Sequence, residues 1–116
     1  MVRTRILLVL AVVGLAACGN ATGPCGPAAI TIEVSVSADA MEPSEIAACR
    51  DQDVTFEIDS QTDGELHLHG YDVEAELTSG ERVGVEFTAD AAGQFIIELH
   101  AAGEEIEIGV LTVQEP

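Results

Sequence analysis

Apolar and polar residues alternate through most of the chain beyond residue 29. In residues 30–37, isoleucine and valine take every second position, and threonine, glutamate and serine take the positions between them. This period of two predicts a strand with one buried face. Similar runs follow at residues 54–58, 66–77 with an interruption near Gly70, 83–87, 95–99 and 106–113.

Turn sequences that contain glycine separate the later runs, at Asp63-Gly64, Ser79-Gly80, Ala92-Gly93 and Ala102-Gly103. Ser44–Arg50, which follows Pro43, has a helical pattern instead and predicts a short helix. Short strands with turn signals between them predict an all-β protein. We expect an antiparallel β-sandwich over residues 30–114.

The first 17 residues have a different pattern. Arg3 and Arg5 precede an apolar run at residues 6–13, and Leu15-Ala16-Ala17-Cys18 follows. This order predicts a signal peptide over residues 1–17, and the apolar run is too short to span a bilayer. The tetrapeptide resembles the lipobox of bacterial lipoproteins, which implies that Cys18 is acylated. We expect residues 18–29 to form a lipidated tether that anchors the protein to a membrane, outside the cytoplasm. The alternative is an ordinary secreted protein.

Charge limits the partners of the mature chain. Of its 99 residues, only Arg50 and Arg82 are basic against 21 acidic residues, which gives a net charge of −19. Such a chain is repelled by nucleic acid, so we expect no nucleic-acid partner. The charge suits a solvated surface under salty or extracellular conditions. An acidic patch that gathers cations is the alternative.

Two cysteines follow Cys18, at Cys25 and Cys49. Exported proteins live where disulfides persist, and we expect these two residues to form one. Closing this loop would stabilise the fold by about 3–4 kcal/mol on the chain-entropy estimate. Metal ligation is the alternative, but no CxxC or Cys-His cluster surrounds either residue.

Two segments carry a family resemblance. The first is His67-Leu68-His69-Gly70-Tyr71-Asp72, and the second is Val85–Asp90 with Gly93-Gln94-Phe95. The first is similar to a His-x-His-Gly-Tyr-Asp segment of bacterial cupredoxin-like lipoproteins. The second is similar to the penultimate hairpin of the cupredoxins, small Greek-key copper proteins. The resemblance covers about residues 30–113 and implies a Greek-key β-sandwich of the cupredoxin type.

The ligands of type 1 copper are missing from the matching positions. Type 1 proteins carry an early histidine and then Cys-x2-His-x4-Met before the final strand. When that strand is aligned without gaps on Ile108–Val113, the three later ligands fall on Leu99, Ala102 and Glu107. Blue copper requires the thiolate. The resemblance therefore implies the fold without a type 1 site and without blue-copper electron transfer.

The chain has three histidines, His67, His69 and His100. His67 and His69 are two residues apart on a predicted strand, so their side chains share one face. We expect that face to point toward the core near the rim of the sandwich, because the odd-numbered positions that follow on the same face include Leu77. His100 is one residue out of phase with that pattern, so it faces away unless a turn after Leu99 brings it back.

Imidazole nitrogen suits copper, zinc and nickel, and Asp72, Glu98 or Glu107 could complete a mixed nitrogen and oxygen shell. We predict a copper site, not of type 1, formed by His67, His69, His100 and Glu107. The alternative is a set of rim histidines that hydrogen-bond to the backbone as relics of a lost site.

Two functions fit these features. The first is a membrane-anchored copper-binding module outside the cytoplasm. The second is a metal-free cupredoxin-like module that binds a partner protein, as an accessory subunit of a membrane complex. We expect no enzymatic activity, because the sequence shows no Ser-His-Asp arrangement, phosphate-binding glycine loop or HExxH motif.

Overall fold

The computed structural model describes residues 25–116. These residues form nine strands: β1 (Ala29–Val36), β2 (Met41–Glu42), β3 (Glu45–Cys49), β4 (Asp53–Ser60), β5 (Gly64–Leu68), β6 (Val73–Leu77), β7 (Arg82–Thr88), β8 (Gly93–Ala101) and β9 (Glu104–Gln114). Within this part of the chain, no helix is long and apolar enough to cross a membrane. The predicted signal peptide and the predicted lipidation site at Cys18 lie outside the described residues.

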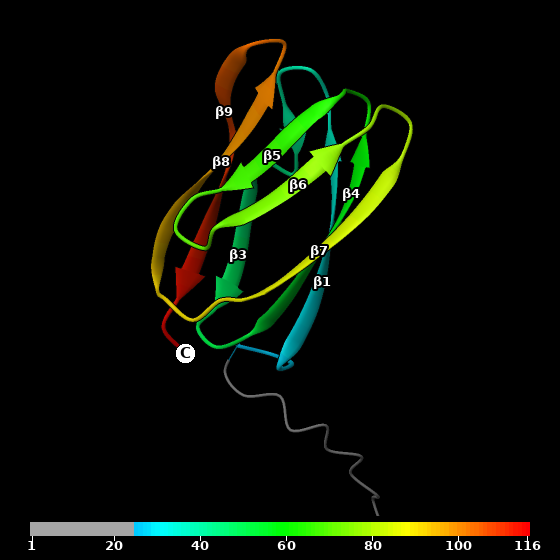
Figure 1. Cartoon of the computed structure of the whole chain (residues 1–116). Coiled ribbons are helices and arrows are strands. Elements are labelled where there is room, and N and C mark those ends of the chain that lie inside the picture. Colours follow the sequence, from blue (N-terminus) through cyan, green and yellow to red (C-terminus); the bar gives the residue numbers. More distant parts are fainter. Residues whose placement is uncertain (1–24) are drawn as a thin grey trace, which may run out of the picture.

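The strands form two sheets that face each other (Figure 1). One sheet has the order β2-β1-β4-β7, and the other has the order β3-β9-β8-β5-β6. This arrangement confirms the predicted all-β sandwich. Two pairs, β1 with β4 and β3 with β9, are parallel. Alternation could not reveal this, because it assigns side chains to faces and says nothing of strand direction.

The helix predicted for Ser44–Arg50 is wrong. Glu45–Cys49 form β3, which pairs with β9 at the edge of the five-stranded sheet. Ile46 and Ala48 are buried while Glu45 and Ala47 are exposed, which is a period of two. The helix preference of alanine amounts to only a few tenths of a kcal/mol per residue, on the order of 0.5. Ladder hydrogen bonds and burial outweigh it.

Aliphatic side chains from both sheets fill the core. The largest of the fully buried side chains are Phe56, Ile58, Leu66, Leu68, Ile97, Leu99, Leu111, Val34, Val36 and Val54. They alternate along their strands with residues that point outward, so each sheet keeps a solvent-facing side. The polar residues of interest lie on the outer side of the five-stranded sheet.

The predicted disulfide between Cys25 and Cys49 is confirmed. It joins the segment before β1 to the end of β3 and so connects the two sheets. The buried Gln52 reinforces this junction. Its Nε2 donates to the carbonyls of Cys25 and Pro27 at 3.1 and 2.8 Å, and its Oε1 accepts from the Cys49 N–H at 2.7 Å. The C-terminus lies at this same end of the sandwich (Figure 1).

Candidate metal centre

Strand β5 places His67 on the outer side of the five-stranded sheet. Its neighbours Leu66 and Leu68 are both 0 % exposed and take the core-facing positions. Successive side chains of a strand point to opposite faces, so His67 points away from the core. The predicted core-facing orientation of the histidine pair is therefore wrong.

The loop after β5 explains this error. The buried residues of β6, Ala75 and Leu77, have odd numbers, whereas those of β5 have even numbers. The parity changes in the turn between the two strands, where Gly70 and Asp72 have positive φ angles of 85° and 52°. Counting back from Leu77 in steps of two across this turn therefore assigns His67 and His69 to the wrong face of the sheet.

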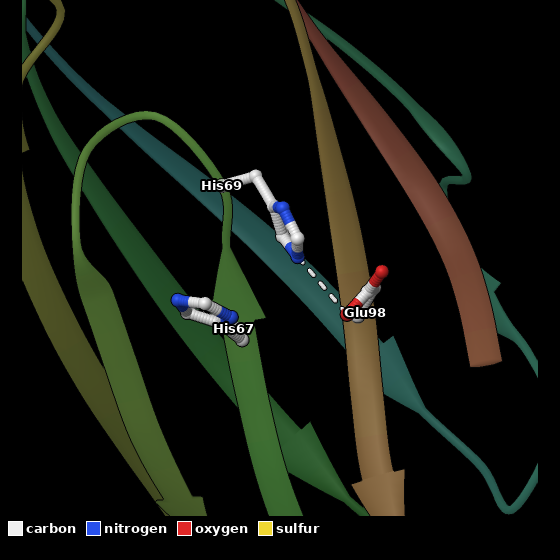
Figure 2. A group of neighbouring side chains, drawn as sticks. All are labelled: His67, His69 and Glu98. Carbon is white, nitrogen blue, oxygen red and sulfur yellow. Dashed lines mark ion pairs between the residues drawn. The ribbon is translucent and has the colours of Figure 1, made fainter. Parts of the chain in front are cut away.

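His69 extends the pairing of β5 with β8 by one further backbone hydrogen bond. Its backbone N–H donates to the carbonyl of Ile96 on β8 at 3.0 Å. This bond holds His69 beside β8, with its imidazole on the same side as that of His67 (Figure 2). The centroids of the two rings are 4.7 Å apart. His69 is the more accessible of the two, with 45 % of its side chain exposed against 23 % for His67.

Strand β8 adds Glu98 and His100 to the same outer side. Leu99 between them is 1 % exposed and packs into the core, so its two neighbours point outward. In the register of β5 with β8, Glu98 lies opposite His67, and His100 lies opposite Glu65. The ring centroids of His67 and His100 are 5.6 Å apart. His100 thus joins the pair without a turn, because the pair itself faces outward.

The carboxylate of Glu98 lies at the centre of this cluster. Its Oε2 atom is 2.9 Å from His69 Nε2 and 3.1 Å from His100 Nε2. Hydrogen bonds from His100 and from His69 hold the pKa of Glu98 below its ordinary value. The same bond to Glu98 raises the pKa of His100. Glu98 is therefore an ionised carboxylate shared by two imidazoles.

Two sets of potential metal ligands share Glu98. The first set adds His67 and His69, and the second adds His100 and Glu105. Within each set, one ligand atom of every residue lies within 4.8 Å of the others. Ligand atoms around one ion are about 3–4 Å apart, because bonds from zinc to nitrogen or oxygen are near 2 Å. Either set would have to contract to hold an ion, and these donors suit Cu(II), Zn(II) or Ni(II).

Glu107, a predicted ligand, is outside both ligand sets. It lies opposite Glu98 in the register of β8 with β9, beyond an irregularity at Ile97 and Glu98. Its side chain is exposed and belongs to neither ligand set. Asp72 lies in the turn before β6 and is also outside both sets. Of the three carboxylates considered from the sequence, Glu98 is thus the one that the structure brings to the histidines.

Glu105 is the member of the cluster that sequence reasoning missed. A usable signal was present in Glu98-Leu99-His100, which repeats the spacing of His67-Leu68-His69 and so places a second pair of donors on one face. The pairing of β8 with β9 then sets Glu105 opposite His100. That register is not encoded in the alternation of either strand.

The positions aligned with the type 1 ligands hold side chains of other chemistry. Leu99 is an aliphatic residue in the core. Ala102 lies in the turn between β8 and β9, with a φ of 52°. Cys25 and Cys49 are bonded to each other, so neither offers a thiolate.

No protein-family model and no curated protein matches the sequence. Solved structures do resemble it. A copper binding protein, determined by NMR in the apo form, has a TM-score of 0.63 and 21 % identity, with 76 % of this chain and 90 % of that chain covered. The metal binding domain of the Cu(I) exporting P-type ATPase CopA of Streptococcus pneumoniae has a TM-score of 0.63 and 13 % identity, with 74 % and 86 % covered.

Auracyanin A, a "blue" copper protein of Chloroflexus aurantiacus, has a TM-score of 0.57 and 20 % identity, with 74 % of this chain and 99 % of that chain covered. This chain has a cupredoxin-like fold. At these identities the likeness concerns the arrangement of the strands. The cluster of histidines and glutamates on the outer side of the cupredoxin-like sandwich is therefore inferred from the residues of this chain and not from the similar structures.

Proposed function

We propose that this protein is a membrane-anchored cupredoxin-like lipoprotein outside the cytoplasm, and that it binds copper through His67, His69 and Glu98. One observation carries the proposal: the chain has three histidines, and all three meet around a single carboxylate. They come from two different strands and a turn, so local sequence alone does not bring them together.

Copper is the favoured ion for two reasons. Among divalent first-row metals, nitrogen and oxygen sites bind Cu(II) most strongly. In addition, several proteins of the same fold are described as binding copper. The proposed site is not of type 1, because its donors are imidazole and carboxylate groups on the outer side of a sheet. We therefore propose copper binding or handling and no blue-copper electron transfer.

Membrane anchoring rests on the Leu15-Ala16-Ala17-Cys18 motif. Several acyl chains on one cysteine anchor firmly, since each buried methylene adds about 0.8 kcal/mol. The test is the fractionation of cells that express Cys18→Ala. We expect this variant to be soluble or unprocessed, and a correctly cleaved variant that stays in the membrane pellet would contradict the proposal.

Copper binding is tested by titrating the full chain with Cu(II), in a Cys18→Ser background that removes the remaining thiol. High ionic strength screens weak binding by surface carboxylates. We expect the His67→Ala/His69→Ala double variant to bind at least about tenfold more weakly. Affinity should also fall as pH drops through about 6.5, because imidazole must be neutral to coordinate.

The matched control for this titration is Glu86→Gln. It removes one exposed carboxylate from β7 on the other sheet and leaves the cluster intact. We expect it to bind Cu(II) as the parent does. Equal binding by the parent and the double histidine variant would refute the proposed function.

A partner-binding module is the second candidate, and Ile96 favours it. Ile96 is the one large hydrophobic side chain that is exposed among the described residues, at 38 %. It lies on β8 next to the cluster, since its carbonyl accepts the N–H of His69. Crosslinking in intact membranes tests this alternative: a partner captured by the parent and lost in Ile96→Asp, with unchanged copper binding, would establish it.

A further inference from the structure

Glu98 occupies the middle of three neighbouring strands. β8 lies between β5 and β9 in the sheet. The first ligand set takes its imidazoles from β5 and the turn after it, whereas the second takes His100 from β8 and Glu105 from β9. Glu98 is the residue common to both sets. The two sets therefore meet at one carboxylate, whose Oε2 atom contacts His69 of the first set and His100 of the second.

A single ion does not reach the donors of both sets. Neither group of ligand atoms that lie within 4.8 Å of one another joins His67 or His69 with Glu105. Ligand atoms around one ion lie at most about 4 Å apart when each bond is near 2 Å. An ion held by His67 and His69 thus leaves the carboxylate of Glu105 unused. A carboxylate has two oxygens and can bind one ion through each of them.

The charges near the cluster also suit more than one cation. Glu74 Oε1 is 3.9 Å from His67 Nε2, and Glu105 Oε1 is 3.9 Å from His100 Nδ1. Glu65 lies opposite His100 in the register. With Glu98, and with Glu107 opposite it in the register of β8 with β9, these carboxylates surround the three imidazoles with negative charge. Nearby opposite charges offset the mutual repulsion of the two ions.

We propose that the outer side of the five-stranded sheet binds two copper ions that share the Glu98 carboxylate. His67 and His69 hold the first ion, and His100 and Glu105 hold the second. This inference rests on the proposed function, which requires only the first ion. It predicts a stoichiometry of two and identifies Glu105 as a ligand.

The experiment is a Cu(II) titration of the full chain in the Cys18→Ser background at high ionic strength, followed by EPR. We expect two equivalents to bind. The second should broaden or weaken the spectrum of the first through dipolar and exchange coupling, because one carboxylate holds both ions. Glu105→Gln and His100→Ala should each bind one equivalent with an unbroadened spectrum. Glu104→Gln is the control, since it removes a neighbouring charge on β9 that belongs to neither set, and it should still bind two.

The outcomes separate this proposal from the proposed function. One equivalent that depends on His67 and His69 but not on Glu105 overturns the two-ion site and leaves the proposed function intact. A second equivalent that survives Glu105→Gln, or that neither broadens nor weakens the EPR spectrum, binds elsewhere and also overturns it. If the parent binds no more copper than the double histidine variant, the two-ion site and the proposed function are both refuted.

Discussion

Glu98 lies directly opposite His67 in the register of β5 with β8, while its Oε2 atom contacts nitrogens of the other two histidines at 2.9 and 3.1 Å. One carboxylate thus contacts two of the three imidazoles and lies beside the third before any ion binds. Removing its charge should therefore change the histidines in ways that can be measured without metal.

The first prediction concerns Glu98→Gln. The hydrogen bond to Glu98 is the largest cause of the raised pKa of His100, so this variant should lower the pKa of His100 toward its ordinary value. An NMR pH titration can follow the ring protons of all three histidines separately. Glu107→Gln serves as the control because it removes an exposed carboxylate outside the ligand sets. An unchanged His100 titration in Glu98→Gln would show that the contact is absent in solution.

The second prediction is the pH dependence of stability. Because the pKa of His100 is raised in the folded protein, its protonated imidazole stabilises the fold at pH values below the ordinary pKa of 6.5. This contribution is lost as the pH rises through the raised pKa. Because the pKa of Glu98 is lowered in the folded protein, its carboxylate stabilises the fold at pH values above the ordinary pKa of 4.5. This contribution is lost as the pH falls through the lowered pKa. Denaturant unfolding of metal-free protein should show the largest difference between the parent and Glu98→Gln from pH 4.5 to 6.5. A difference that does not vary with pH would disagree with this assignment.

The third prediction concerns colour. Copper added to the protein should give the pale spectrum of nitrogen and oxygen ligands, because Leu99 cannot supply a thiolate and Cys25 is bonded to Cys49. Absorption spectroscopy of the Cu(II)-loaded protein checks this. An intense thiolate charge-transfer band near roughly 600 nm would contradict our assignment of the ligands.

The fourth prediction concerns Gly70, which follows His69. A Cβ atom at Gly70 would overlap the ring of Phe95 at Cδ1, and the φ of 85° disfavours other residues. Gly70→Ala should lower the free energy of unfolding by about 2–4 kcal/mol, the sum of strain and overpacking. Gly80→Ala is a matched control, because Gly80 has a φ of 84° and no atom lies within 4 Å of the place that an added methyl group would take. Equal losses in the two variants would show that the Phe95 contact contributes nothing.

The fifth prediction concerns Gln52, whose side chain bonds three backbone groups near the disulfide. Gln52→Leu leaves these groups without their partner and should lower the free energy of unfolding by about 1–3 kcal/mol. Thermal or denaturant unfolding measures the loss. Gln94→Leu, at an exposed position of β8, should stay within about 0.5 kcal/mol of the parent. A Gln52 variant as stable as that control would contradict the reinforcing role.

The alternation of residues such as Ile30, Ile32 and Val34 was sufficient to predict the strands and the sandwich, because burial of one face dictates a period of two. It failed at Ser44–Arg50, where a short run of alanine and isoleucine satisfies both a helix and an edge strand. Only the pairing with β9 decides between the two.

The candidate site shows a similar division. The spacing of His67 and His69 correctly placed two imidazoles together, since this property is local. The face they occupy depended on the four-residue turn at 69–72, which sets Leu68 opposite Val73 and so exchanges even and odd positions between β5 and β6. The approach of Glu98 and Glu105 depended on the register of three strands, and register is a property of the folded sheet.

The Cys25–Cys49 bond also has a mechanical consequence. Cys49 pairs with Gln114 at the end of β9, so a force applied to the chain ahead of Cys25 passes directly into the five-stranded sheet as well as along β1. Without the crosslink, that force would load β1 alone and pull it from β4. With it, tension is divided between the two layers at the end of the sandwich where the chain enters. A protein held by its N-terminal segment would thereby resist being unravelled from its point of attachment.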